Sequence, residues 1–164
     1  MLEIKAKLKI ARGAYRIDVR GRVGLTFEQR SRFPARARLE SGEEVNVALA
    51  PGEVLRGGDL ATASDGRVFE IVAQEEDLLH VEMAAVELTR LAYRLGSRHV
   101  PAEVGAGHLR IAASDSAALE ADGVQARPVR APFEPEFEPH AAHEHDGHCD
   151  HDHHGHPHHH HDHR

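Results

Sequence analysis

Histidine dominates the C-terminal end of the chain, where 13 of the 25 residues from 140 to 164 are histidine. Imidazole nitrogen is a good ligand for Ni²⁺, Zn²⁺ and Cu²⁺, and the aspartates and the one cysteine between the histidines add further donors. These overlapping sites need no preformed cage, so we expect them to bind several divalent ions with weak selectivity. Binding requires neutral imidazole and should fail below about pH 6. The predicted tail ligands are His143, His145, His148, Cys149, His151, His153, His154, His156, His158, His159, His160, His161 and His163.

Two other interpretations of this segment are weaker. A purification tag is usually an unbroken run of six or more histidines, whereas the longest run here is four, His158 to His161. A tail that only keeps the protein in solution would be rich in Glu, Lys or Ser rather than His. Because almost nothing in it is apolar, we expect residues 137–164 to form a disordered metal-binding tail.

His99 is the candidate ligand outside the tail, within the segment "YRLGSRHVP". We expect Gly96 to end a helix as its C′ residue and His99 to begin the next strand. Spacing alone does not make His99 a ligand, because a lone histidine beside apolar residues is more often structural. His80 alternates with apolar neighbours in "LLHVEM" and should face solvent.

Composition narrows the classes of function. A net charge of −7 argues against nucleic acid as a partner, since phosphate binding needs a basic surface. No apolar run approaches the roughly 18 residues that span a membrane, and "MLEIKAKLKI" lacks the apolar core of a signal peptide. We therefore expect a cytoplasmic protein. No Ser/His/Asp or Cys/His set indicates nucleophilic catalysis, so we expect no enzyme.

The elements that must position His99 fall into two groups, and the fold class is α+β. Residues 1–75 show short alternating runs separated by turn signals such as Ser41-Gly42 and Asp65-Gly66, which predicts a small all-β domain or partial barrel. Residues 76–136 follow the order β-α-β-β-α-β, which is typical of a ferredoxin-like domain. Pro128 indicates that the last strand lies at a sheet edge.

An arginine cluster, Arg30, Arg32, Arg36 and Arg38, lies within the first group. The favoured interpretation is a solvated strand face. The alternative is a docking surface for an acidic partner.

Five segments of the chain together resemble a known family, the urease accessory nickel metallochaperones UreE. They are "FEQRSRFPARARLESGEEV", "LAPGEVLRGGDLA", "DGRVFEIVAQEE", "LAYRLGSRHVPAEV" and "RAPFEPE". The resemblance covers most of residues 1–139 and extends to a His-rich tail. The segments "LGSRHVP" and "APFEPE" are its most specific parts.

The resemblance implies a homodimer in which His99 and its symmetry mate hold one Ni²⁺ for delivery, through a GTPase, to apo-urease. It implies an N-terminal peptide-binding domain and no catalysis. The chain departs from the family where some members carry further histidines: Ser114 and Ser116 flank Asp115, and Arg94 replaces a histidine. These changes argue against a second metal site in the folded part.

Two hypotheses from other classes stay open at this point. A general divalent-metal buffer without a client would explain the tail alone. A prolyl isomerase with a His-rich tail would need an aromatic pocket, which five Phe, two Tyr and no Trp do not favour. Dimer and metal-bridged tetramer cannot be distinguished from the sequence.

Overall fold

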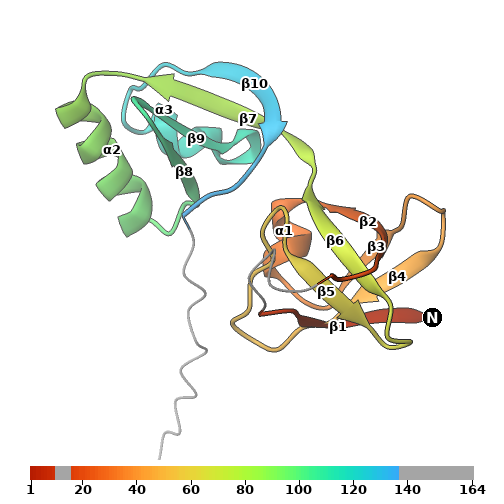
Figure 1. Ribbon diagram of the computed structural model, residues 1–164. Helices are drawn as coiled ribbons and strands as arrows, with labels where there is room; N and C mark the ends of the chain where they lie inside the picture. The colour runs from red at the N-terminus through yellow and green to blue at the C-terminus, as the bar shows by residue number, and fades with distance from the viewer. Residues whose placement is uncertain (10–15, 137–164) are drawn as a thin grey trace, which may run out of the picture.

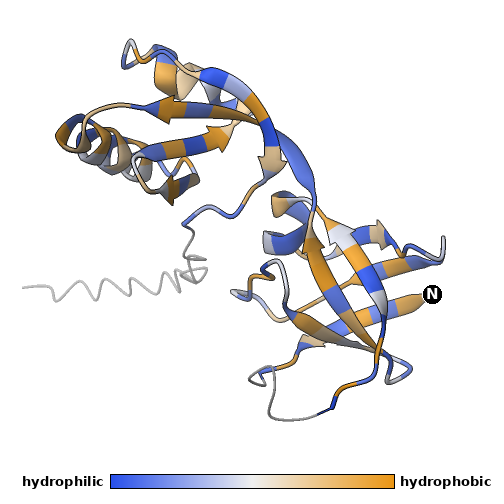
Figure 2. Ribbon diagram, turned by 45° about the horizontal axis from the view of Figure 1, so that its top comes forward, coloured by the Kyte–Doolittle hydropathy of each residue, from blue (hydrophilic) through white to orange (hydrophobic). Residues whose placement is uncertain are grey.

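The computed structural model describes residues 1–9 and 16–136, which form two units, each built on its own sheet (Figure 1). All predicted tail ligands lie outside the described residues. Polar and apolar residues alternate along the strands of both sheets (Figure 2), as expected where one face of a strand is buried. The described part of the chain contains no helix long and apolar enough to cross a membrane.

The first unit is a six-stranded sheet in the order β2-β6-β5-β1-β4-β3. A bridge between Val23 and Leu39 links the two ends of this order, so the sheet curls toward a closed barrel around an aliphatic core. The predicted turns at Ser41-Gly42 and Asp65-Gly66 join antiparallel pairs, β3 with β4 and β5 with β6. The elements are β1 (Leu2–Lys7), β2 (Val19–Leu25), α1 (Phe27–Ser31), β3 (Ala35–Arg38), β4 (Glu44–Val47), β5 (Leu60–Ala63) and β6 (Val68–Ala73).

The second unit follows the predicted β-α-β-β-α-β order on an antiparallel sheet, β10-β7-β9-β8. Both α2 and α3 contribute leucines to one core cluster, so they cover the same face of this sheet. Pro128 lies on β10, which is an edge strand as predicted. The elements are β7 (Glu75–Glu82), α2 (Ala85–Ser97), β8 (Ala102–Gly105), β9 (His108–Ala112), the 3-10 turn η1 (Ala113–Asp115), α3 (Ser116–Glu120) and β10 (Arg127–Pro132).

Helix α2 is amphipathic because Leu88, Leu91 and Leu95 recur on one face, and all three are buried. Val86 is 59% exposed and belongs to the outer face. One detail of the sequence prediction was wrong. Gly96 lies inside the helix rather than after it, since α2 continues to Ser97.

The junction between the two units is built around Arg30, whose side chain is fully buried. Its guanidinium donates to the carbonyls of Leu25 and Leu55 within the first unit. It also donates to the Phe133 carbonyl and pairs with the Glu134 carboxylate at 2.9 Å. Arg30 therefore joins α1 to the segment that follows β10. The prediction that it belongs to a solvated strand face was wrong, because it lies on a helix that faces the second unit.

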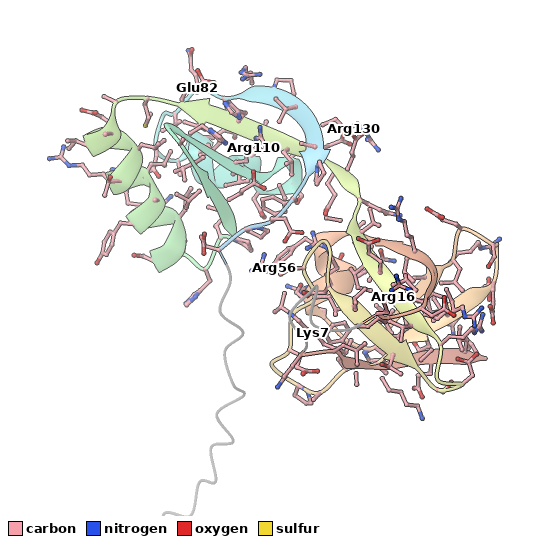
Figure 3. The ribbon with its side chains drawn as sticks, in the orientation of Figure 1. Lys7, Arg16, Arg56, Glu82, Arg110 and Arg130 are labelled. Atoms are coloured by element: carbon pink, nitrogen blue, oxygen red, sulfur yellow. The ribbon has the colours of Figure 1, made fainter. Side chains whose placement is uncertain are left out.

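Further contacts close the junction around Glu134. Its carboxylate also pairs with Arg56 at 3.2 Å and accepts from the Gly57 amide at 2.8 Å. Figure 3 shows Arg56 on the side of the first unit that faces the second. The rings of Phe27 and Phe133 meet edge to face, with centroids 5.5 Å apart. The junction thus combines an apolar contact with a charge network, which fixes the two units against each other.

We predict that Arg30→Leu lowers the free energy of unfolding by about 3 kcal/mol, because it leaves three carbonyls and the Glu134 carboxylate without their donor. Denaturant unfolding would measure the change. The matched control is Arg36→Leu on β3, where the side chain is exposed; this variant should stay within about 0.5 kcal/mol of the parent. Equal effects of the two substitutions would contradict the role given to Arg30.

Candidate metal site at the end of α2

His99 occupies the position at the end of α2 that glycine usually takes. The Val100 amide bonds to the Leu95 carbonyl and the His99 amide bonds to the Gly96 carbonyl, each at 3.0 Å. This pair of bonds defines a Schellman motif with His99 as its C′ residue. His99 accordingly has φ 58°, and among the described non-glycine residues it alone has positive φ.

The left-handed backbone conformation of His99 costs free energy, on the order of 1–3 kcal/mol for a strained non-glycine residue. Val100 offsets part of it by packing on the same core as Leu95, the apolar contact that commonly accompanies this motif. The turn directs the chain from α2 straight into β8. It leaves the His99 side chain exposed.

His99 lines a cleft of about 520 Å³ that lies between the two units. The α1 side contributes Phe27 and Arg32, and the second unit contributes Pro101 and Asp115. Phe133 of the junction around Arg30 lines the cleft as well, so the cleft adjoins this junction. The predicted ligand is therefore exposed on a surface shaped by both units.

The described residues, 1–9 and 16–136, contain no group of three His, Cys, Asp or Glu side chains that could hold a metal ion. Of the described residues that line the cleft, His99 is the one histidine. Divalent ions of the nickel and zinc class take four or more ligands, so a metal held here needs ligands from elsewhere. The serines around Asp115, Ser114 and Ser116, add no imidazole.

The prediction that His80 faces solvent was wrong, since it is 5% exposed. It does point away from the helix-covered face of the sheet, as its alternation with Leu79 and Val81 implies. Neighbouring side chains bury it there: the His108 ring stacks on it with centroids 4.6 Å apart, and Arg110 bonds to it. Periodicity gave the correct face but could not show that this face is covered.

Both ring nitrogens of His80 are engaged. Arg110 Nε donates to Nδ1 at 3.1 Å, so the ring hydrogen is assigned to Nε2, which lies 2.7 Å from the Glu82 carboxylate. Figure 3 shows Arg110 and Glu82 on the sheet of this unit. The hydrogen bond with His80, together with one from Arg127, lowers the pKa of Glu82. His80 has no lone pair left for a metal and acts as a structural residue.

Arg98, the residue before His99, reaches across to the end of α3. Its guanidinium binds both carboxylate oxygens of Asp122, at 3.0 and 3.1 Å, and also donates to the Ala118 carbonyl. Arg94 approaches the same carboxylate at 3.4 Å. These hydrogen bonds and charges, those of Arg98 foremost, lower the pKa of Asp122 from its ordinary value of 3.8. No local sequence pattern points to Asp122, because only the fold brings it to Arg98.

We predict that His99→Gly is more stable than His99→Ala by about 1 kcal/mol, because glycine adopts positive φ without strain and alanine does not. Thermal or denaturant unfolding of the two variants would measure the difference. At Arg90, an exposed interior residue of α2, the same pair of substitutions should rank in the opposite order. If alanine is the better residue at both positions, His99 does not occupy a left-handed position in solution.

We also predict that Asp122 contributes stability above its ordinary pKa of 3.8 that disappears in acid. The folded state binds the proton less readily than the unfolded chain, so the contribution is complete above about pH 5 and is lost as pH falls through the lowered folded-state pKa. In unfolding measurements across this range, Asp122→Asn should weaken the loss of stability on acidification. An unchanged slope would contradict the Arg98–Asp122 pairing.

Two family models match consecutive parts of the chain: the UreE urease accessory protein N-terminal domain matches residues 10–74, and the C-terminal domain matches residues 76–163. The urease accessory protein UreE of Pseudomonas fluorescens strain Pf0-1 is 43% identical over 77% of this chain and 79% of its own length. The protein of the same name from Cupriavidus necator is 40% identical over 83% of this chain and 73% of its own. With both domains matched in order, the chain belongs to the UreE family of urease accessory proteins.

Proposed function

We propose that this protein is a nickel metallochaperone that delivers Ni²⁺ to apo-urease during urease maturation and catalyses nothing itself. The observation that carries the proposal is His99, an exposed imidazole held at a Schellman turn in a cleft between the two units. Family membership gives the urease context. Zn²⁺ and Cu²⁺ are the competing ions, since imidazole binds both and the Irving–Williams order places Cu²⁺ above Ni²⁺.

A single histidine explains why the working form should be a homodimer. Two copies of His99, one from each chain, would hold one Ni²⁺ across the interface and leave coordination positions for solvent or for the next ligand. That incomplete ligand set suits a carrier, because a closed site would keep its ion. A metal-bridged tetramer is the alternative assembly, and the accessory GTPase with apo-urease is the proposed receiver in the cytoplasm.

In this proposal, three consecutive segments of the chain have separate roles. Residues 1–75 form the β-domain for protein contacts, residues 76–136 form a ferredoxin-like metal-binding domain, and residues 137–164 collect metal through their histidines and Cys149. A tether of about 25 residues keeps collected ions at an effective concentration in the millimolar range near His99.

A general divalent-metal buffer without a client is the second candidate. The described residues contain no group of three metal ligands, so most of the metal-binding capacity would have to lie in the tail. A tail that binds most of the metal is what a buffer needs. A buffer would retain Zn²⁺ and Ni²⁺ alike and would bring down no GTPase in a pull-down against urease accessory proteins. A delivery protein, in contrast, should bring down the accessory GTPase in the same pull-down.

We predict that deletion of the chain after Pro139 sharply reduces the number of bound Ni²⁺ ions but leaves one per two chains. His99→Ala in the truncated chain should remove that last ion, and in the full chain it should impair urease activation more than the truncation does. Equilibrium dialysis with metal analysis would count the ions, with oligomeric state followed in parallel. His108→Ala is the control within the folded part, and it should leave the last ion in place. Retention of the ion by truncated His99→Ala would mean that the site is elsewhere.

A further inference from the structure

The two helices of the second unit end in the same way. After α3, the Val124 amide bonds to the Leu119 carbonyl and the Gly123 amide bonds to the Glu120 carbonyl, each at 3.0 Å. Gly123, with φ 64°, therefore takes the C′ position of α3 that His99 takes in α2. One helix end has the residue that sterics favour, and the other has the proposed metal ligand.

The residues that precede these two positions are paired with each other. Arg98 precedes His99, Asp122 precedes Gly123, and the guanidinium and carboxylate meet through two parallel hydrogen bonds. The Asp122 side chain is only 10% exposed and that of Arg98 is 41% exposed, so the carboxylate of this bidentate pair is the better shielded partner. Its geometry leaves Arg98 little freedom, and His99 is the next residue in the chain.

We propose that Asp122 is a positioning residue for the metal site, acting through Arg98 to hold His99 in its left-handed conformation. The inference rests on the proposed role of His99 as a ligand. The same two Schellman hydrogen bonds form around Gly123 at the end of α3. They therefore do not by themselves explain what holds a strained histidine at the end of α2. The Arg98–Asp122 pair adds a side-chain restraint directly beside the strained His99. Asp122 itself lies at the end of α3, where Gly123 adopts positive φ without strain.

Charge gives Asp122 a second consequence at this site. Arg94 and Arg98 bring two positive charges to the end of α2, where a divalent cation is to be bound. Asp122 contacts both guanidinium groups and offsets part of their repulsion of the ion. Positioning and charge compensation can be separated experimentally because Arg94 contributes charge without the bidentate geometry.

The experiment measures Ni²⁺ affinity of the full-length chain by competition with a chelator, always as the difference between a chain and the same chain carrying His99→Ala. The subtraction removes the contribution of the tail. Asp122→Asn should weaken the His99-dependent binding about tenfold, the usual effect of removing a group that orients a metal ligand. Asp122→Glu keeps the carboxylate and should recover part of the affinity. The control is Asp77→Asn, which removes an exposed carboxylate paired with Arg130 in the same unit and should change nothing.

The double variant Asp122→Asn with Arg94→Gln restores the parental net charge without restoring the pair. If positioning is the cause, affinity stays low; full recovery would overturn positioning and leave only a charge effect. Arg98→Lys keeps its charge but loses the bidentate geometry, and it provides the test should Asp122→Asn not fold. Parental Ni²⁺ affinity in Asp122→Asn or in Arg98→Lys would overturn the proposal. Unchanged metal binding on His99→Ala alone would instead refute the proposed function, and with it this inference, before Asp122 is altered.

Discussion

The buried guanidinium of Arg30 is the constraint on which the arrangement of the two units depends. Its three nitrogens lie in one plane, and they contact two carbonyls of the first unit together with Phe133 and Glu134, which follow the last strand of the second. A buried charge of this kind is tolerated only when its partners are complete, so the junction is specific for one geometry. The cleft that contains His99 has walls from both units and therefore inherits that geometry.

The site itself reflects a compromise between stability and function. A glycine at the C′ position would suit the backbone of α2 better, as Gly123 shows at the end of α3. Glycine, however, offers no imidazole. A histidine in that position is exposed, which under the proposed function suits a ligand that must meet a second protein surface. Strain at a functional residue, with supporting contacts around it, is the usual form of this compromise.

The sequence was sufficient for the element order of the second unit and for the turns at Ser41-Gly42 and Asp65-Gly66, because these depend on local signals: alternation and Gly-containing turns. The metal-binding role of His99 stays a prediction. The sequence failed where distant parts of the chain meet. His80 and Arg30 both occupy faces that local pattern reads as solvent-exposed, and each is buried by residues more than 25 positions away. Gly96 was the obvious helix stop, yet the bonds from His99 and Val100 place the stop three residues later. Periodicity cannot choose between two candidate stops within one turn of helix.

The arginine at position 94 acquires a physical meaning from the same contacts. An arginine near the proposed cation site would by itself be unfavourable. In this structure its guanidinium approaches Asp122, which already binds Arg98, so the added charge has a partner. Under the proposed function, His99 is the imidazole donor at the end of α2, and the histidines beyond Pro139 bind additional ions. The folded domain then determines where one ion is transferred, and the tail determines how many ions are available.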